Sequence, residues 1–374
     1  MSSAETSKTD IGLRLAASLV ASPHAHGGNS VSQTMLRVKM ALVPATLFGF
    51  WLFGWQSFFL WALTILSCLG FEVLALRLMG SKRIKATLLD GSALLTGWLL
   101  AMSLPPWAPW WVAVLGGFIA IIIGKQVFGG VGQNVFNPAM VARVALLVSF
   151  PVPMTQWVTP LPLSSAASLD FVHSLRQFLT SMPVPDAMAS ASVLGYSKTE
   201  LSRGIDLFHS LSSAHAPSIS WLGSRVGSFG ESASLLIFGG GLYLLARGII
   251  TWHTPVAVLA GLAIPAAIGH SVDPAHYLSA TVHLLSGAAM LGAFFIATDY
   301  VTSPNTASGQ FVFGLGIGFL TWVIRTYGGY PEGLAFAVLL MNALTPVIDR
   351  LIKPRILGRD RKGKPLSIPE SGDA

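Results

Sequence analysis

A long apolar run from Met40 to Met79 is the feature that most constrains how this chain can fold. The run spans nearly forty residues, about twice the ~20 that one helix needs to cross the hydrocarbon core of a bilayer. Gly54, Trp55 and Gln56 interrupt it, which predicts two consecutive membrane helices near residues 38–54 and 57–79. Only 10% of the 374 residues are charged, whereas soluble domains carry about a quarter. We therefore expect lipid to be the solvent for most of the surface.

Eight further segments have the length or composition of membrane helices. They occupy residues 91–105, 110–127, 134–150, 232–247, 254–270, 279–298, 309–326 and 333–352. Several are short or interrupted by Gly and Pro, which membrane helices tolerate only where neighbouring protein covers the broken backbone. The sequence therefore predicts an all-α integral membrane protein with about ten transmembrane helices.

Positive charge is distributed unevenly among the predicted loops, and this predicts the orientation of the chain in the membrane. With ten crossings, the N-terminal arm, the loop 82–85, Lys125, Arg247 and the tail after residue 353 all lie on the cytoplasmic side. The stretch 151–231 lies on the opposite side and holds four basic and five acidic residues. We therefore expect both termini in the cytoplasm and a large extracytoplasmic segment.

Two pairs of similar stretches indicate an internal duplication. Gly91–Ala101 parallels Gly287–Ala297 at an offset of 196 residues, and Gly129–Gly130 parallels Gly328–Gly329 at an offset of 199. Repeats of this kind place a functional site at their interface, although the packing of small residues also recurs by chance. The predicted organisation is a cytoplasmic arm at 1–37, a first five-helix repeat at 38–150, the extracytoplasmic segment at 151–231, a second repeat at 232–352 and a basic cytoplasmic tail at 353–374.

Amide side chains at membrane depth are the first candidates for binding a ligand. The stretch Lys125–Ala139 is rich in glycine and carries Gln133, Asn134 and Asn137. An unsatisfied amide at this depth is costly, so each must bond either to the broken backbone or to a polar ligand. The residues alone leave both alternatives open.

Acidic side chains beside helix breaks are the second group of candidates. Asp299, Glu332 and Asp349 each lie next to small residues, where an ion pathway would need oxygen ligands. The alternative for each carboxylate is an interfacial position at the end of a span. Glu72 lies inside the second span, five residues before Arg77, and is expected to snorkel or to pair near the cytoplasmic face.

Other classes of function leave no trace in the sequence. The single cysteine, Cys68, excludes an internal disulfide and a cysteine-ligated cluster within the chain. The histidines lack metal-ligand spacing, and no glycine signature for NAD is present. The net charge of +7 is not clustered as in nucleic-acid-binding proteins, so we expect membrane lipid and no nucleic acid as a partner.

The polar stretches resemble the RnfD family and, more distantly, NqrB. The similarity runs from Ser22-Pro-His through Asp90–Ala93, Gly129–Ala139 and Arg325–Gly333 to Leu339–Ala343. It implies a subunit, without activity of its own, of an Rnf-type translocase that moves electrons between ferredoxin and NAD⁺ and transports Na⁺ or H⁺. It further implies the partners RnfA, RnfB, RnfC, RnfE and RnfG, and a place in the bacterial inner membrane.

The resemblance also implies two flavins. Asn134 and Asn137 match asparagines that line a noncovalent riboflavin site in the family. The segment Asp186–Leu194 resembles the pattern D-x-x-(S/T)-G-A-(T/S)-x-L, whose last hydroxyl carries FMN through a phosphoester, and this places covalent FMN at Ser192. Ala189 and Ser190 depart from the pattern, so an ordinary serine-rich loop is the alternative.

A non-redox solute channel or transporter built from the same kind of five-helix repeat is the competing hypothesis. A channel of this kind needs neither flavin nor partner subunits. The block Gly132–Pro138 and the large extracytoplasmic segment favour the redox hypothesis, and a flavin assay discriminates between the two.

Overall fold

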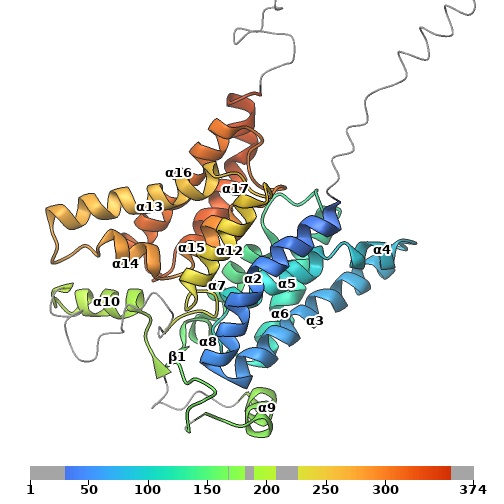
Figure 1. Ribbon diagram of the computed structural model, residues 1–374, viewed down its shortest axis with the longest axis horizontal. Helices are drawn as coiled ribbons and strands as arrows, with labels where there is room; N and C mark the ends of the chain where they lie inside the picture. The colour runs from blue at the N-terminus through green and yellow to red at the C-terminus, as the bar shows by residue number, and fades with distance from the viewer. Residues whose placement is uncertain (1–29, 167, 182–188, 208–225, 355–374) are drawn as a thin grey trace, which may run out of the picture.

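The computed structural model describes residues 30–166, 168–181, 189–207 and 226–354 (Figure 1). In this part of the chain, six helical segments are long and apolar enough to cross a membrane. They are α2 (Val31–Phe53), α3 (Trp55–Leu78), the segment Trp110–Phe128 that begins with α6 (Trp110–Phe118), α13 (His253–Val272), α16 (Ala307–Tyr327) and α17 (Leu334–Leu351). The prediction of a helical fold of membrane type is confirmed.

Shorter apolar helices occupy the remaining predicted spans. These are α5 (Ser92–Ser103), α7 (Pro138–Ser149) and α12 (Ser234–Ala246). The predicted span 279–298 is a broken segment made of α14 (Ala280–Leu285), α15 (Ala289–Leu291) and the π-helix η3 (Gly292–Ile296). The number of crossings and the duplication stay predictions.

The connections are short helices and one small sheet. The helices are α4 (Ile84–Leu89), α8 (Pro151–Thr155), α9 (Phe171–Thr180) and α10 (Val193–Ser202), with the π-helix η1 (Ile119–Ile123) and the 3₁₀ turn η2 (Gln126–Phe128) following α6. The strands β1 (Trp157–Val158) and β2 (Ala189–Ser190) pair antiparallel, with Trp157 opposite Ser190.

Local sequence explains where the first helices begin and end. Ser30 caps α2, because its side chain accepts a hydrogen bond from the Gln33 amide. Gly54 separates α2 from α3 with φ of 76°, a left-handed conformation that glycine adopts at little cost. The break expected at Gly54 is therefore confirmed. By contrast, the helix expected from residue 134 begins only at Pro138, because Asn137 is its N-cap.

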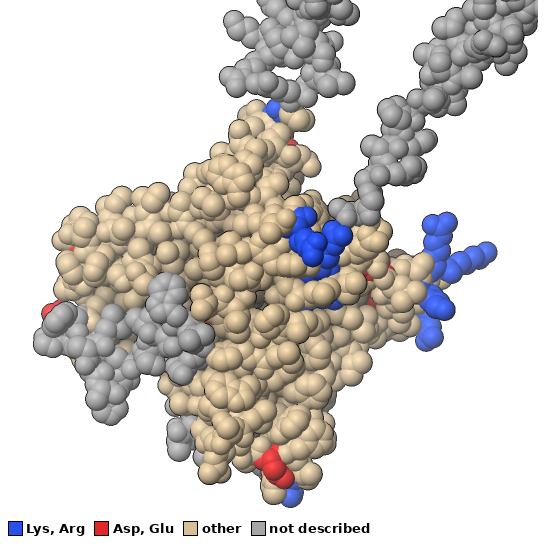
Figure 2. Space-filling model, viewed as in Figure 1, with Lys and Arg blue, Asp and Glu red and all other residues tan. Residues whose placement is uncertain are grey.

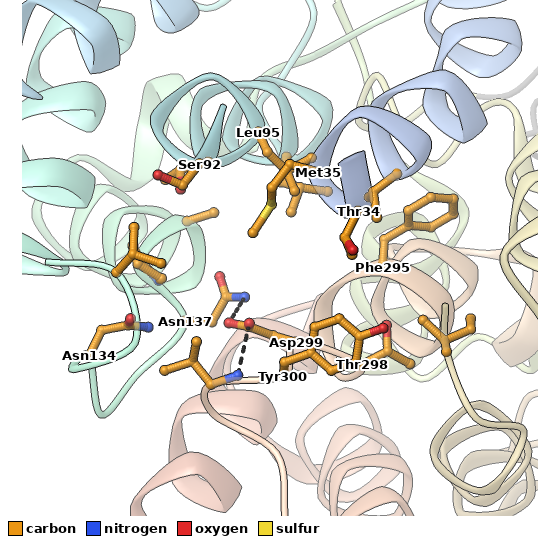
Figure 3. Close-up of a pocket in the computed structure, with 18 of the residues that line it drawn as sticks. Thr34, Met35, Ser92, Leu95, Asn134, Asn137, Phe295, Thr298, Asp299 and Tyr300 are labelled. Atoms are coloured by element: carbon orange, nitrogen blue, oxygen red, sulfur yellow. Dashed lines mark hydrogen bonds between the residues drawn. The ribbon is translucent and has the colours of Figure 1, made fainter. Parts of the chain in front are cut away.

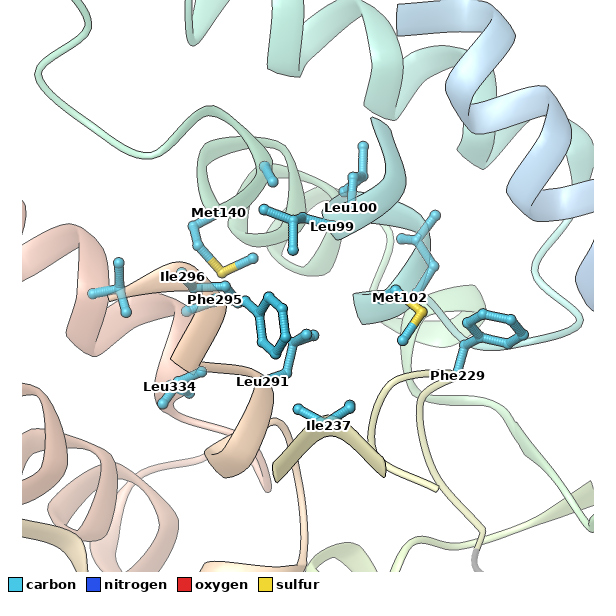
Figure 4. Close-up of a cluster of buried hydrophobic side chains, with 14 of the residues drawn as sticks. Leu99, Leu100, Met102, Met140, Phe229, Ile237, Leu291, Phe295, Ile296 and Leu334 are labelled. Atoms are coloured by element: carbon cyan, nitrogen blue, oxygen red, sulfur yellow. The ribbon is translucent and has the colours of Figure 1, made fainter. Parts of the chain in front are cut away.

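The two halves of the chain lie side by side (Figure 1). Helix α12 packs on α2 and α17 packs on α7 across the halves, whereas α13 packs on α16 within the second half. Side chains from both halves meet in one buried cluster between them (Figure 4). The first half contributes Leu99, Leu100, Met102 and Met140, and the second half contributes Ile237, Leu291, Phe295, Ile296 and Leu334.

Polar elements gather at opposite ends of this bundle. Helices α9 and α10 lie at one end, whereas the start of α2 and the end of α17 lie at the other (Figure 1). Figure 2 shows blue lysine and arginine side chains beside the start of α2 and around α4, with a broad uncharged surface next to them. The orientation of the chain in the membrane stays a prediction.

Candidate functional site

A cavity of about 110 Å³ lies between the two halves and contains both predicted asparagines (Figure 3). We call it the asparagine cavity. Its polar lining comes from the start of α2, the start of α5, the loop before α7 and the end of η3, and its apolar lining includes two phenylalanines. The polar and charged side chains in the lining that matter for ligand binding are those of Ser92, Lys125, Asn134, Asn137 and Asp299, and the aromatic ring of Phe295 lines the cavity as well.

Asn137 joins the two halves of the chain at this cavity. Its Oδ1 accepts a hydrogen bond from the Met140 amide at 3.3 Å and so caps α7, while its Nδ2 donates to Asp299 Oδ2 at 3.4 Å. Its backbone amide donates to Oδ1 of Asn342 on α17 at 3.1 Å. Asn137 therefore satisfies the helix start and faces the cavity at once.

Asn134 is less constrained than Asn137. Its Nδ2 donates to the Phe136 carbonyl at 3.0 Å, and its side chain lines the cavity. Figure 3 shows Asn134 on the loop and Asn137 beside Asp299, with Thr34 and Met35 facing them from α2. The asparagines bond to backbone groups and also line a cavity, so ligand binding by these amides stays a prediction.

A second cavity, of about 30 Å³, contains Ser192, and we call it the Ser192 cavity. Ser192 is 5% exposed and is the N-cap of α10, where its Oγ accepts a hydrogen bond from the Gly195 amide at 3.2 Å. Arg143, Glu231 and Glu332 line the same cavity. Asp186, the first residue of the FMN-attachment pattern, lies outside the described residues.

Arg143 brings a buried positive charge to this cavity from the middle of α7. It is 5% exposed, its Nη1 donates to Met154 Sδ at 3.8 Å, and its guanidinium lies 6.0 Å from the Trp157 ring centroid. No carboxylate lies within salt-bridge distance of it among the described residues. Sequence reasoning missed Arg143, although an arginine inside an apolar span is itself a signal of function.

Glu332 and Glu231 hold the broken segment of the second half in place. Glu332 pairs with Arg325 at 3.1 Å and accepts a hydrogen bond from the Ala288 amide at 3.0 Å. Glu231 accepts hydrogen bonds from the amides of Gly287 and Ser228. The carboxylates thus satisfy amides that the break leaves without helical partners.

The three carboxylates predicted for an ion pathway lie in different places. Asp299 lines the asparagine cavity and Glu332 lines the Ser192 cavity. Asp349 accepts hydrogen bonds from the backbone amide and Nδ2 of Asn305, at 3.1 and 3.0 Å, near the end of α17. Nowhere in the described chain do three His, Cys, Asp or Glu side chains gather as a metal site.

Lys198 ties α10 to the second half. Its Nζ lies 3.5, 3.2 and 3.1 Å from the carbonyl oxygens of Ile324, Arg325 and Tyr330, and donates hydrogen bonds to them. Partial burial lowers the pKa of the Lys198 ammonium from its usual value. Ser192 caps the same helix, so these bonds connect the helix that begins at the Ser192 cavity with the second half.

Of the two alternatives for Glu72, snorkelling and pairing, the structure has pairing, and the partner is Lys125. Lys125, counted among the cytoplasmic loop charges, is buried. Lys125 Nζ lies 2.8 Å from Glu72 Oε1, and the two side chains are only 3% and 0% exposed. Lys125 lies between η1 and η2, where its side chain points into the protein instead of toward solvent.

Comparison with known proteins identifies the family. The NQR2, RnfD, RnfE family matches residues 18–358 of this chain. The chain belongs to this family. The RnfD-type protein of the ion-translocating oxidoreductase complex from Halorhodospira halophila is 49% identical over 95% of this chain and 99% of its own length. Proteins of the same name from Stutzerimonas stutzeri and Rhodobacter capsulatus are 49% and 48% identical, over 90% and 82% of this chain and 95% and 84% of their own lengths.

Membership of the NQR2, RnfD, RnfE family and the apolar helices together make the chain a multi-pass membrane protein. The resemblance expected from the sequence is thereby confirmed. Both cavities, and every residue named in them, fall within the matched range.

Proposed function

We propose that this chain is the flavin-carrying membrane subunit of an Rnf-type, ion-translocating ferredoxin:NAD⁺ oxidoreductase. Its relatives, at 42–49% identity, are named as one subunit of an ion-translocating oxidoreductase complex. A subunit of this kind has no activity alone and works with RnfA, RnfB, RnfC, RnfE and RnfG. Flavins supply the redox chemistry, and the chain binds and orients them.

The relation between the two cavities is the observation that carries this proposal. Asn137 at the start of α7 lines the asparagine cavity, and Arg143 on the same helix lines the Ser192 cavity. Six residues of α-helix span about 9 Å. A single helix therefore connects a cavity lined by amides with one that holds a buried cation, as a relay of two neighbouring cofactors requires.

The helix start at Ser192 and the nearby Arg143 suit an FMN phosphoester, while the carboxylates that line the same cavity bind backbone amides. A phosphate on Ser192 Oγ would lie at the N-terminus of α10, where backbone amides and the helix dipole favour negative charge. The Arg143 guanidinium faces the same cavity and has no carboxylate within salt-bridge distance among the described residues. Arginine is well suited to binding phosphate through two parallel hydrogen bonds.

The asparagine cavity fits a noncovalent riboflavin. Phe294, Phe295 and Leu99 provide apolar walls, while Asn134 and Asn137 provide amide groups of the kind that orient a planar heterocycle. No nearby cluster of basic side chains marks a phosphate site in the described lining, since Lys125 is its one basic residue. A flavin without a phosphate suits such a lining better than a nucleotide.

The proposed placement in the membrane follows the charge distribution and the positions of the helices. The six long helices, the three shorter ones and the broken α14–η3 segment make ten crossings, arranged as two five-helix repeats. Both termini lie in the cytoplasm of a bacterium, and α10 with Ser192 lies on the outer face of the inner membrane.

Flavin analysis of the purified complex tests the proposal. We expect one flavin that stays on this chain in a denaturing gel and another that is released when the protein is denatured. A chain that carries neither flavin, within a complex shown to be active, would contradict the proposal and favour the solute channel. The same measurement on Ser192→Ala and on the double Asn134→Leu, Asn137→Leu variant assigns each flavin to its cavity.

A further inference from the structure

A buried ion pair lies directly beside the asparagine cavity. Lys125 Nζ donates to Glu72 Oε1 and to Ser92 Oγ, both at 2.8 Å. Lys125 and Ser92 line the cavity, whereas Glu72 is fully buried behind them on α3. The ammonium group therefore stands between the carboxylate and any molecule in the cavity.

The backbone just before Lys125 packs closely against its neighbours. Gly124 precedes Lys125, and a Cβ atom there would lie 2.7 Å from the Ala120 carbonyl oxygen and 3.0 Å from Pro138 Cα. The chain thus packs tightly against the π-helix η1 and the start of α7. The Lys125 side chain reaches Glu72 from this closely packed backbone.

Two features of the pair are not explained by stability. Burying two charges is costly, and apolar residues of similar volume usually stabilise a protein as well as a buried pair does. In addition, Glu72 Oε2 is buried and has no hydrogen-bond partner among the described residues. Lys125 uses two of its three N–H groups on Glu72 and Ser92, which leaves one for a ligand in the cavity.

We propose that Glu72 and Lys125 balance charge for the asparagine cavity, with Glu72 taking up one proton when the group bound in the cavity gains one electron. This inference rests on the proposed function, because it requires a redox-active ligand in that cavity. Before reduction the pair is neutral as a whole. Protonation of Glu72 leaves the Lys125 charge uncompensated, and this one positive charge offsets the negative charge that the electron brings.

The hydrogen bond in the structure provides the path for the proton. The Lys125 ammonium passes a proton along its 2.8 Å hydrogen bond to Glu72 Oε1, and a proton taken up from bulk solvent through the cavity restores the Lys125 ammonium. The net change is one electron in the cavity and one proton on Glu72. The electron comes from the redox partner of the complex or, in an experiment, from dithionite.

Few other titratable groups face this pair. Cys68 lies one turn before Glu72 on α3, and Asp90 precedes α5, where its Oδ1 accepts from the Ser92 amide. Lys39 of α2 approaches Gly91, and Asp299 faces the cavity from the second half. Helices α6 and η1 carry no charged residue, and Lys85 of α4 is exposed. Asp299 is therefore the main competitor of Glu72 for the proton.

The test is a redox titration of the noncovalent flavin in the purified complex between pH 6 and pH 9. Uptake of one proton per electron lowers the midpoint potential by about 59 mV for each tenfold fall in proton concentration. We expect this slope in the unmodified complex and in the control Asp349→Asn, whose carboxylate binds Asn305 and lines neither cavity. In Glu72→Gln the potential should not change with pH, and a protonated-carboxyl band should disappear from the reduced-minus-oxidised infrared difference spectrum.

Several results would overturn the inference. If the midpoint potential in Glu72→Gln still falls by about 59 mV per pH unit, with normal flavin content, the inference is wrong and the proposed function stands. Absence of noncovalent flavin from the unmodified complex would instead contradict the proposed function itself. If Glu72→Gln does not assemble, the uncharged double variant Glu72→Gln, Lys125→Met should assemble and show no slope. Absence of a reduction-induced carboxyl band in the unmodified complex refutes the inference without any variant.

Discussion

Asn137 and Asp299 lie 162 residues apart in the sequence, yet Asn137 Nδ2 donates to Asp299 Oδ2 across 3.4 Å at the wall of the asparagine cavity (Figure 3). This bond links the start of α7 to the end of η3, so each half of the chain supplies one side of the cavity. Polar residues of two distant stretches therefore line one wall. A ligand bound there would contact both halves at once.

Replacing Asn137 should separate its capping role from its role in the cavity. Asn137→Leu loses the α7 cap and the bond to Asp299, and loss of a cap costs about 1 kcal/mol. Asn137→Ser retains a capping oxygen but lacks the amide that reaches Asp299. We expect both variants to lose noncovalent flavin, measured as flavin released from the denatured protein, and only Asn137→Leu to lose thermal stability. Full flavin retention in the double Asn134→Leu, Asn137→Leu variant would assign these amides to the backbone alone.

Replacing Ser192 should abolish covalent flavin on this chain. Co-expression with a flavin transferase should give a fluorescent band on a denaturing gel, and Ser192→Ala should remove it because no hydroxyl remains to form the phosphoester. Ser190→Ala, two residues earlier, is the matched control and should keep the band. A band that survives Ser192→Ala would move the attachment site to another residue.

Arg143 should hold the phosphate of that flavin without being required for attachment. In Arg143→Gln the fluorescent band should remain, because Ser192 keeps its hydroxyl. The midpoint potential of the covalent flavin should fall, since a buried positive charge that stabilises the reduced form has been removed. An unchanged potential would show that the guanidinium faces away from the flavin and serves only to pack against Trp157.

Lys198 should control how firmly α10 is held against the second half. Lys198→Met removes three hydrogen bonds from a charged donor to the carbonyl groups of Ile324, Arg325 and Tyr330. Hydrogen bonds to charged groups contribute about 1.5–3 kcal/mol each when buried, and less at a partly exposed site. We expect amide hydrogen exchange in α10 to rise at least tenfold, with exchange in α13 unchanged as the internal reference. Equal exchange in the variant would mean that apolar contacts hold α10.

Cysteine labelling in intact cells should determine the orientation. The natural Cys68 is fully buried and provides a low background. Cysteine introduced by Ser202→Cys, on exposed α10, should react with a membrane-impermeant reagent, whereas Lys82→Cys should react only after the cells are opened. Labelling of both positions from the same side would contradict the proposed topology.

The sequence alone determined the class of the protein, the places of its helices and the stretches that line the cavities. Long apolar runs with few charges are stable only in lipid. Each run consists of contiguous residues, so membrane helices can be predicted from the sequence without knowing how they pack. The breaks at Gly54 and near the Gly129 block followed from glycine, which adopts backbone conformations that other residues avoid. The glycine-rich stretch with Asn134 and Asn137 was predicted as a candidate binding site, and both asparagines line the larger of the two cavities.

Only the tertiary structure decided which charges meet. Glu72 and Lys125 are 53 residues apart, and Arg143 reaches the Ser192 cavity from a different element, so no spacing along the chain relates them. Lys125 looked like a loop charge because the inward turn after η1 has no signature beyond its glycines. Pairing across helices depends on packing, since a buried charge takes whichever partner the fold brings within hydrogen-bond distance. For that reason Asp299, Glu332 and Asp349, similar in sequence context, occupy three different sites.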